Sequence, residues 1–515
     1  MARTPLLDML QRAVRQHARS EFEGRPLRQR QAGLKRRDVL RGGAGLALAS
    51  IVPATGLAAT ARIAIVGAGL AGLTAARELR KANLVTDLFE GNTRIGGRCY
   101  TARDFFNDGQ IAEHGGEFID SDHTDILTLA RELDLTVDDV LKATPKGTHE
   151  LYFFNGKPYD LAAASRDWAP LQPVVKQQSI DVGDYDYSSS TPAARRFDAM
   201  TITQWVSTYV PGGRTSQLGK LIENALTEEN GADPDQQSAL SVIGALSDNK
   251  RHKFNLYYNE SDQRFHVHGG NDQIPTLVSK GLGDKVETGT ALVAIARLSD
   301  GRLRLSLKRD GAITDRIYDR VILALPFSLM RTMVDYRSAG FQPLKQRAIQ
   351  TLPIGASTKF QMQFTRRAWN EAGCNGEARV PSQAFQTTWE VSRAQPGDSG
   401  ILNYFSGGTR ALNAGKTDNV TLANEVLDNL APVLPMLGKY PNGLMIKDAW
   451  KTNPWSLGSY SYYQPGYATT LLGIEAVPEG NCFFAGEHTA EQNGFLNAAV
   501  STGIRAAKEV IASLK

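Results

Sequence analysis

Two glycine-rich segments stand near opposite ends of the chain. The first is Gly67-Ala68-Gly69-Leu70-Ala71-Gly72, which follows a short apolar run at residues 63–66, and the second is Ala485-Gly486-Glu487 with Gly494-Phe495 after it. Gly67 permits a tight turn, Gly69 lets the backbone approach a pyrophosphate, and Gly72 lets a helix pack closely on the preceding strand. The first segment therefore predicts a dinucleotide site, the alternative being a glycine-rich turn without a ligand.

Glu90 adds a second requirement of such a site. It ends a strand-like run at residues 84–89, about 20 residues after the glycines, where an acid accepts hydrogen bonds from ribose hydroxyls. An acid here disfavours a 2′-phosphate, and therefore NADP. Residues 73–81 are rich in helix formers, so the pyrophosphate would lie at a helix N-terminus. Strand, turn, helix and second strand together predict a Rossmann-like unit.

The residues after Glu90 narrow the choice of cofactor. Residues 91–98 end in Gly97 and Arg98, which bring backbone amides and a guanidinium group beside the pyrophosphate. Arginine suits this place because its planar fork binds phosphate oxygens in a bidentate way. Here the sequence resembles the flavin-containing amine oxidase family, which includes monoamine oxidases, polyamine oxidases and L-amino acid oxidases. The resemblance extends over residues 62–515 and implies FAD as the cofactor.

The family resemblance also implies the domain organisation. We expect an α/β and α+β fold, with a discontinuous Rossmann-like FAD-binding domain, a mixed-sheet substrate domain and a helical subdomain. Residues 62–118, 262–342 and 446–515 would form the FAD-binding domain. Residues 119–261 would form the helical part of the substrate domain, and residues 343–445 its sheet part. The sequence pattern predicts strands over 286–296, 303–307 and 318–325, helices over 125–135, 218–226 and 496–510, and a loop over 181–191.

The expected contacts with FAD follow from the same resemblance. The peptide Leu292–Val293 would meet the adenine end, and Gly486 and Glu487 would contact the pyrophosphate and the ribityl chain. The full set is Gly67, Gly69, Ala71, Gly72, Glu90, Gly97, Arg98, Gly115, Gly116, Glu117, Leu292, Val293, Trp455, Tyr460, Gly486, Glu487, Gly494 and Phe495. Ser459 stands where monoamine oxidases carry a flavin-linked cysteine. Because serine cannot form that thioether, we expect FAD to be bound non-covalently.

Lys359 is the candidate for a direct role beside the flavin. It matches the family lysine that holds a water against flavin N5, although a lysine in an alternating strand ordinarily points to solvent. Tyr460 and Phe495 match two aromatic walls that flank the substrate amine, exclude water and favour the neutral amine. Core packing is the alternative for both aromatic residues. The implied chemistry is hydride transfer from the substrate to the cofactor.

Tyr404 and Glu117 bear on the substrate. Tyr404 matches a tyrosine that contacts the substrate carboxylate in L-amino acid oxidases. Those enzymes can carry a carboxylate-binding arginine where this chain has Phe118, so the carboxylate partner is not placed. Glu117 would favour a cationic tail, as in arginine, lysine or a polyamine, or would be a structural acid held by backbone amides.

We therefore expect an FAD-dependent L-amino acid oxidase that forms a 2-oxo acid, ammonium and hydrogen peroxide. One alternative is a polyamine or monoamine oxidase on the same fold. Two further alternatives are a dehydrogenase that passes electrons to an acceptor other than dioxygen, and a flavoprotein that binds a partner without turnover.

The basic character of the chain belongs to its N-terminus. Residues 1–41 hold 11 Lys/Arg and 4 Asp/Glu, a net of +7, so the whole-chain +4 leaves about −3 for the rest, which argues against a nucleic-acid partner. Lys35-Arg36-Arg37 precedes a soft apolar stretch and resembles a twin-arginine export signal. We expect residues 1–61 to be a leader and the enzyme to be periplasmic or secreted, the alternative being a basic disordered tail.

The remaining composition sets limits on other classes. No uninterrupted apolar run reaches the roughly 18 residues of a membrane-spanning helix. The three cysteines stand at unrelated spacings and indicate neither a disulfide framework nor a zinc site. The expected partners are a small amino acid or amine and dioxygen, and we expect a homodimer.

Overall fold

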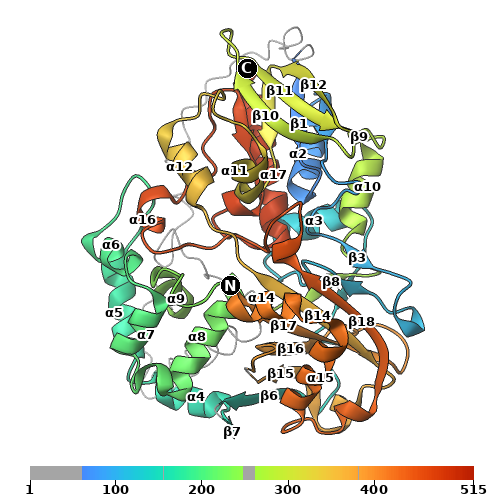
Figure 1. The fold of residues 1–515 in the computed structure, drawn as a ribbon, viewed down its shortest axis with the longest axis vertical. Helices are drawn as coiled ribbons and strands as arrows, with labels where there is room; N and C mark the ends of the chain where they lie inside the picture. The colour runs from blue at the N-terminus through green and yellow to red at the C-terminus, as the bar shows by residue number, and fades with distance from the viewer. Residues whose placement is uncertain (1–60, 155, 248–260, 381) are drawn as a thin grey trace, which may run out of the picture.

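A five-stranded parallel sheet forms the core of the upper half of the molecule in Figure 1. The computed structural model describes residues 61–154, 156–247, 261–380 and 382–515, so the predicted leader lies almost entirely outside the described residues. The strand order is β19-β13-β1-β2-β9. The bounds are β1 Ile63–Val66, β2 Thr86–Phe89, β9 Val286–Glu287, β13 Arg320–Leu323 and β19 Cys482–Phe484. Three segments far apart in the sequence therefore build one sheet, as the predicted α/β fold requires.

Helices α2 (Leu70–Lys81) and α17 (Leu496–Ser513) pack against each other beside this sheet (Figure 1). A Cβ added to Gly503 of α17 would lie 2.4 Å from the carbonyl oxygen of Ala71, so the two backbones meet closely at this glycine. Helices α3 (Thr124–Glu132) and α10 (Gln273–Gly281) lie alongside and share the same apolar cluster. This packing brings the C-terminal glycine-rich segment beside the N-terminal one.

A second, antiparallel sheet of three strands stands at the end of the parallel sheet. It contains β10 (Ala291–Arg297), β11 (Leu303–Arg309) and β12 (Ala312–Tyr318). The predicted strands at 286–296 and 318–325 each merge two strands of the structure. Strands β9 and β10 are separate, and β12 and β13 belong to different sheets. Two-stranded sheets pair β3 (Thr101–Ala102) with β4 (Ala112–Glu113) and β5 (Val137–Asp139) with β8 (Phe265–Val267).

A seven-stranded sheet with the order β18-β14-β17-β16-β15-β6-β7 lies in the lower half of the molecule in Figure 1. Its strands are β6 His149–Phe154, β7 Lys157–Pro158, β14 Ser357–Phe364, β15 Cys374–Arg379, β16 Thr387–Glu390, β17 Gly400–Gly407 and β18 Pro441–Ala449. The predicted boundary at 445/446 falls inside β18, which pairs with β14. Strands β6 and β7 come from the region predicted to be helical, and they extend this sheet at its edge.

The remaining helices belong to the helical subdomain or lie between strands of the two large sheets. The helical subdomain holds α4 Leu161–Trp168, α5 Gln172–Val182, α6 Pro192–Asp198, α7 Ile202–Tyr209, α8 Gln217–Asn230 and α9 Leu240–Leu246. The other helices are α11 Phe327–Met333, α12 Pro343–Thr351, α13 Ala368–Glu371, α14 Gly408–Lys416, α15 Asn419–Leu430 and α16 Ala468–Leu471. Residues 183–191, between α5 and α6, contain no helix or strand, so the predicted loop is confirmed except at Asp181 and Val182, which end α5.

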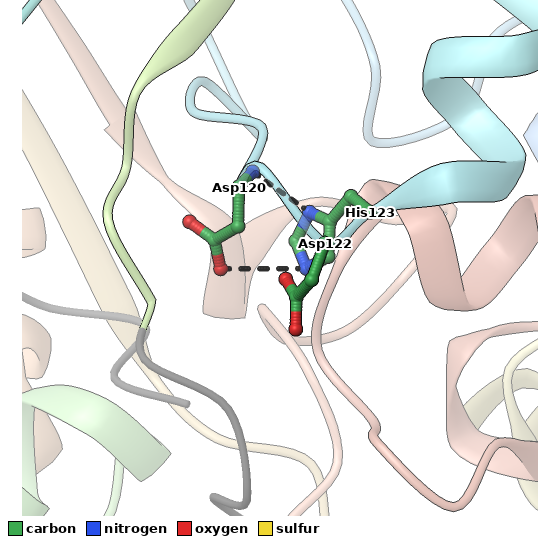
Figure 2. Close-up of side chains that lie close together, drawn as sticks. All are labelled: Asp120, Asp122 and His123. Atoms are coloured by element: carbon green, nitrogen blue, oxygen red, sulfur yellow. Dashed lines mark hydrogen bonds and ion pairs between the residues drawn. The ribbon is translucent and has the colours of Figure 1, made fainter.

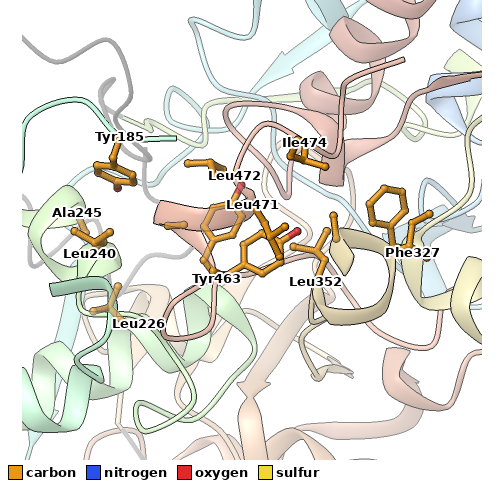
Figure 3. Packing of buried hydrophobic residues seen from close by; sticks show 14 of the residues in the cluster. Tyr185, Leu226, Leu240, Ala245, Phe327, Leu352, Tyr463, Leu471, Leu472 and Ile474 are labelled. Atoms are coloured by element: carbon orange, nitrogen blue, oxygen red, sulfur yellow. The ribbon is translucent and has the colours of Figure 1, made fainter. Parts of the chain in front are cut away.

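A continuous apolar core joins the helical subdomain to the FAD-binding half. Figure 3 shows side chains of this core, with Leu226 and Leu240 from α8 and α9 at one side and Phe327 at the other. Tyr463 and Leu471 lie between them. Within the described residues, no helix has both the length and the apolar character needed to cross a membrane. The three cysteines are buried and unpaired.

Candidate active site

One pocket lies where the parallel sheet, the seven-stranded sheet and the N-termini of α2 and α17 meet. Most of the predicted cofactor contacts line it: Gly67, Gly69, Ala71, Glu90, Gly97, Arg98, Gly115, Gly116, Glu117, Leu292, Trp455, Tyr460, Gly486, Glu487, Gly494 and Phe495. Lys359 lines the same pocket. Gly72 and Val293 do not line it, and neither does Tyr404. The fold thus gathers residues from the beginning, middle and end of the chain around one cavity.

The glycines of the first segment have different steric roles. Gly67 has a φ of +102°, and a Cβ there would lie 2.7 Å from the carbonyl oxygen of Ala324. At Gly72 a Cβ would lie 1.9 Å from the carbonyl oxygen of Gly67, so this residue packs α2 against the turn. A Cβ at Gly69 would meet no protein atom within 4 Å, which leaves space beside its backbone. The turn therefore offers backbone and a helix N-terminus to an anionic group.

Glu90 stands at the end of β2 with both carboxylate oxygens engaged by the backbone. The amide N–H groups of Ala68 and Asn92 donate to Oε2 and Oε1, each at 2.8 Å. Burial raises the pKa of Glu90, although these two amides act against the rise. A carboxylate oxygen has more than one lone pair, so Glu90 can still accept from a ribose hydroxyl.

Arg98 and Glu487 join the two glycine-rich segments. Arg98 Nη1 donates to Glu487 Oε1 at 3.0 Å and to the carbonyl oxygen of Ser459 at 2.6 Å. Glu487 Oε2 accepts from Ser461 Oγ and from the amide of Gly494, both at 3.0 Å. Burial acts to raise the pKa of Glu487, but Arg98 and the neighbouring donors hold it below its ordinary value. Glu487 is therefore a fixed carboxylate that orients Arg98 at the pocket wall.

These features fit the FAD that the resemblance implies. A helix N-terminus and an arginine suit the pyrophosphate. Glu90 suits a ribose, and Leu292, the residue expected at the adenine, lines the same pocket. Val293 turns away, and its carbonyl oxygen accepts from the amide of Asp335 at 2.8 Å because β10 carries a bulge at this point. The adenine contact of this peptide stays a prediction, in which Leu292 lines the pocket and Val293 does not.

Lys359 is buried and fully engaged. Its Nζ donates to the carbonyl oxygen of Glu113 at 2.7 Å, to that of Gly115 at 3.2 Å and to Glu117 Oε2 at 2.7 Å. The other oxygen of Glu117 accepts from Trp389 Nε1 at 3.0 Å. Neither side chain of the ion pair is more than 6% exposed. Glu117 is therefore held by a lysine and an indole, and not by backbone amides as the structural alternative supposed.

Tyr404 lies on the wrong face of its sheet to contact a substrate in this pocket. In the β14–β17 register, Lys359 lies opposite Phe405 and Phe360 lies opposite Tyr404. Phe405 and Lys359 line the pocket, whereas Tyr404 packs with Phe360 and Phe385 in the core behind the sheet. The predicted carboxylate contact of Tyr404 is corrected, because side chains alternate between faces along a strand. The neighbouring residue, Phe405, takes the place in the wall.

The predicted aromatic walls both reach the pocket. Tyr460 OH donates to the carbonyl oxygen of Glu228 at 3.0 Å, which fixes its ring. The ring of Phe495 packs edge-on against His123, with centroids 4.9 Å apart. Phe118, Trp389 and Phe405 add aromatic surface to the same cavity. Ser459, at the position of the flavin-linked cysteine of monoamine oxidases, also lines it and lies 3.0 Å from Ser357 Oγ.

Asp120 is a lining acid that the sequence did not single out. Its Oδ1 accepts from Ser261 Oγ at 2.9 Å and from the amide of Gln263 at 2.8 Å. Its Oδ2 is buried, makes no hydrogen bond and lies 3.4 Å from His123 Nε2. Burial raises the pKa of Asp120 to about 7. In the sequence, the one hint that Asp120 belongs to the site is its position three residues after Glu117. The fold is what places it in the cavity wall.

Figure 2 shows the ring of His123 between the backbone nitrogen and the carboxylate of Asp120. The amide of Asp120 donates to Nδ1 at 3.0 Å, so the neutral ring carries its proton on Nε2, toward Asp120 Oδ2. Burial lowers the pKa of His123 to about 4. Candidate ligand atoms of Asp120, Asp122 and His123 lie within 4.8 Å of one another. At neutral pH the imidazole is therefore an uncharged, oriented neighbour of the acid.

Arginine is scarce at the substrate end of the cavity. Among the described residues that line it, the arginines are Arg94 and Arg98. Arg94 donates to the carbonyl oxygens of Ile95 and Gly97, and Arg98 pairs with Glu487. Both belong to the cofactor side. No arginine among the described residues that line the cavity is therefore placed to bind the carboxylate of a substrate.

Comparisons with known proteins show the family and the fold of this chain. A family model described as flavin containing amine oxidoreductase matches residues 70–511. An L-amino acid dehydrogenase of Synechocystis sp. is 24% identical over 474 residues, covering 87% of this chain and 94% of the relative. An L-amino-acid oxidase of Siganus canaliculatus is 25% identical over 472 residues, covering 87% and 85%. The solved cyclohexylamine oxidase from Brevibacterium oxydans IH-35A superposes with a TM-score of 0.75 at 20% identity, covering 88% of this chain and 99% of that one.

The family model spans most of the chain, and the fold brings both glycine-rich segments to one cavity that suits FAD. On these grounds the protein belongs to the flavin-containing amine oxidoreductase family, and FAD is its cofactor.

Proposed function

We propose that the protein oxidises basic L-amino acids, such as lysine or arginine, by FAD-dependent oxidative deamination. The observation that carries the substrate class is Asp120, an acid in the cavity wall whose Oδ2 makes no hydrogen bond within the described residues and has a long contact of 3.4 Å to His123 Nε2. Glu117 does not serve this purpose, because Lys359 already neutralises it. Above about pH 7, where Asp120 is ionised, it offers a negative charge for the cationic tail of a substrate. The relatives named for L-amino acids support an α-amino acid at the other end.

The chain's own residues would hold the amine for this chemistry. Tyr460 and Phe495 would flank it, and Phe118, Trp389 and Phe405 would exclude water from the same cavity. When bound, FAD would supply a hydride acceptor for the amine carbon, and transfer of two electrons and two protons onward to dioxygen would give hydrogen peroxide. Water then hydrolyses the released imine to a 2-oxo acid and ammonium.

A diamine or polyamine is the second candidate substrate. The scarcity of arginine at the substrate end favours it, because no described guanidinium is placed to bind a carboxylate there. Such a substrate would use Asp120 in the same way, with one ammonium at the acid and the other amine at the flavin.

Matched substrate pairs separate the two candidates. The purified yellow protein would be assayed for peroxide with lysine and cadaverine, arginine and agmatine, and ornithine and putrescine, since the members of each pair differ only in the carboxylate. Higher kcat/KM for the amino acids supports the first candidate, and higher values for the amines support the second. Leucine and phenylethylamine serve as tail-free controls, and equal activity on these would contradict the assignment of Asp120.

The electron acceptor is tested in the same assay. Flavin bleaching without oxygen reports substrate oxidation alone, and recovery of the yellow colour on mixing with air reports the reaction with dioxygen. Bleaching followed by recovery only with a quinone would identify a dehydrogenase. Absence of bleaching with every amine would leave a flavoprotein without turnover.

A further inference from the structure

We propose that Glu117 is a positioning residue that holds Lys359 in its charged form and directs it to the flavin side of the cavity. The inference does not depend on the substrate named in the proposed function; it rests on the expectation, taken from the family resemblance, that Lys359 faces the bound flavin. In this proposal Glu117 pairs with Lys359 and does not bind the cationic tail of the substrate.

The first argument is the number of donors on the ammonium. A protonated lysine has three N–H donors and no acceptor. Lys359 Nζ has three acceptors within hydrogen-bond distance, two backbone carbonyls and the carboxylate of Glu117. A neutral amine has only two N–H donors and could not satisfy all three. The site is therefore built for the ammonium.

The second argument is charge. Both backbone carbonyls are dipoles, so Glu117 is the group in direct contact that carries a full opposite charge. A buried ammonium without a counter-ion tends to lose its proton, because desolvation penalises the charged form. At 2.7 Å the carboxylate offsets this penalty.

The third argument is that the carboxylate of Glu117 also accepts a hydrogen bond from Trp389. Trp389 Nε1 donates to Glu117 Oε1, so the glutamate is held from the β16 side while it holds the lysine on β14. Trp389 also lines the cavity. The weakest of the three lysine contacts is the one to Gly115, at 3.2 Å, so this is the donor that a water molecule can capture with least loss.

The other titratable groups around the ammonium are already paired. The carboxylate of Glu113 accepts from Thr101 and lies 2.9 Å from His266 Nε2. Asp448, opposite Lys359 in the β14–β18 register, lies 2.9 Å from His114 Nδ1. Burial opposes protonation of His266, but its hydrogen bond to Glu113, assisted by the charge of Glu117, raises its pKa. Loss of Glu117 therefore acts mainly on Lys359 and, more weakly, on His266.

The first test needs neither flavin nor turnover. Urea unfolding of the apoprotein would compare Glu117→Gln, Lys359→Met and the double variant with the wild type. If the pair is formed, each single variant lowers the urea midpoint and the double variant lowers it by clearly less than the sum. Glu475→Gln is the matched control, since Glu475 is also a buried glutamate but lies away from the cavity. Combined with Lys359→Met it should be additive, and additivity for Glu117 would overturn the pairing.

The second test follows the flavin without an amine substrate. Holoenzyme reduced with dithionite would be mixed with oxygenated buffer between pH 6 and pH 10, and the reoxidation rate constant would be measured. In Glu117→Gln we expect the pH profile of this rate to move toward lower pH, because the variant lacks the carboxylate that pairs with the ammonium of Lys359. Glu117→Asp should restore part of the profile, and Lys359→Met should be slow and independent of pH.

A wild-type profile in folded Glu117→Gln holoenzyme would overturn the proposal and leave Glu117 a structural acid. A selective rise of KM for lysine over leucine, with an unchanged reoxidation profile, would overturn it in favour of substrate binding. Because dithionite replaces the amine, this test stands even where no amine reduces the flavin, so the failure of the proposed function is a separate result.

Discussion

Side chains of β14 and β17 alternate between two environments, and this alternation decides which residues can act in the cavity. Lys359 and Phe405 face the cavity, whereas Phe360 and Tyr404 face the core behind the sheet. The sequence names Tyr404 and Phe405 as neighbours but does not say which of them points inward. A shift of one residue exchanges the two faces, so only the register settles the question.

Tyr404→Phe should therefore leave the enzyme's activity unchanged. The Tyr404 hydroxyl is buried and has no hydrogen-bond partner, and burial raises its pKa. Removing such a group costs nothing in the cavity and relieves an unpaired polar atom, worth about 1 kcal/mol of unfolding free energy. We expect kcat/KM within twofold of the wild type and an equal or higher urea midpoint. A tenfold fall in kcat/KM would restore Tyr404 to the substrate site.

Asp120→Asn tests the acid of the cavity wall through pH. With its pKa raised to about 7, Asp120 is ionised only above neutral pH, so kcat/KM for lysine should rise through pH 7 in the wild type. The variant should lack this rise and lose about 10-fold or more at pH 8, as expected for a lost charge-assisted hydrogen bond. Leucine or phenylethylamine should be affected much less. Equal losses for both kinds of substrate would contradict a role in tail recognition.

The same shift has a consequence for stability. Because the folded pKa of Asp120 lies above its ordinary value, its stabilising contribution is present below about pH 4 and is lost as the pH rises through 7. Asparagine stays neutral over this range. The unfolding free energy of Asp120→Asn relative to the wild type should therefore increase from pH 4 to pH 8, and a constant difference between these pH values would argue against the raised pKa.

At the scale of elements, the close approach of α2 and α17 sets the geometry of the cofactor site. Both helices begin at the cavity, since Leu70 and Leu496 line it. Gly503 lets the two backbones meet, and a side chain there would collide with the carbonyl oxygen of Ala71. The sequence predicted both helices, but their contact depends on how the parallel sheet places them.

Gly503→Ala should push these helices apart. We expect a loss of about 1–3 kcal/mol in unfolding free energy, as for other overpacked sites, together with weaker FAD binding. Gly281→Ala is the matched control, because Gly281 also lies in a helix and a Cβ there would meet nothing within 4 Å. Urea unfolding of the apoprotein and FAD titration would measure both effects. An equal response of the two variants would mean that the α2–α17 contact is not tight.

At the scale of the whole molecule, the cavity is assembled from segments separated by hundreds of positions in the sequence. Gly69, Leu292 and Gly486 come from three different parts of the chain, and Lys359 comes from a fourth that belongs to the other sheet. A ligand that binds only this assembled form must stabilise all of them together.

FAD should therefore raise the stability of the entire fold and be released when the fold is lost. At a free FAD concentration 100 times Kd, linkage predicts about 2.7 kcal/mol of added stability. After denaturation and ultrafiltration, the yellow colour should pass into the filtrate, because Ser459 offers no thiol for a flavin bond. Flavin retained with the denatured chain would disprove non-covalent binding.

The sequence by itself determined the cofactor class and much of the fold. The spacing from Gly67 to Glu90 and the segment around Gly486 are local patterns, and their chemistry follows from turn, helix terminus and charge. The predicted domain boundary at 445/446 falls inside β18, which pairs with β14, because a local pattern does not contain the sheet partner of a strand.

Only the tertiary structure decided the partners of the buried charges. It paired Glu117 with Lys359, turned Tyr404 away and brought Asp120 into the cavity wall. These outcomes depend on strand register and on contacts between distant segments, neither of which a local pattern contains. Charges buried in the same cavity act on one another at short range, so the substrate class of this protein depends on that assembly and not on any single motif.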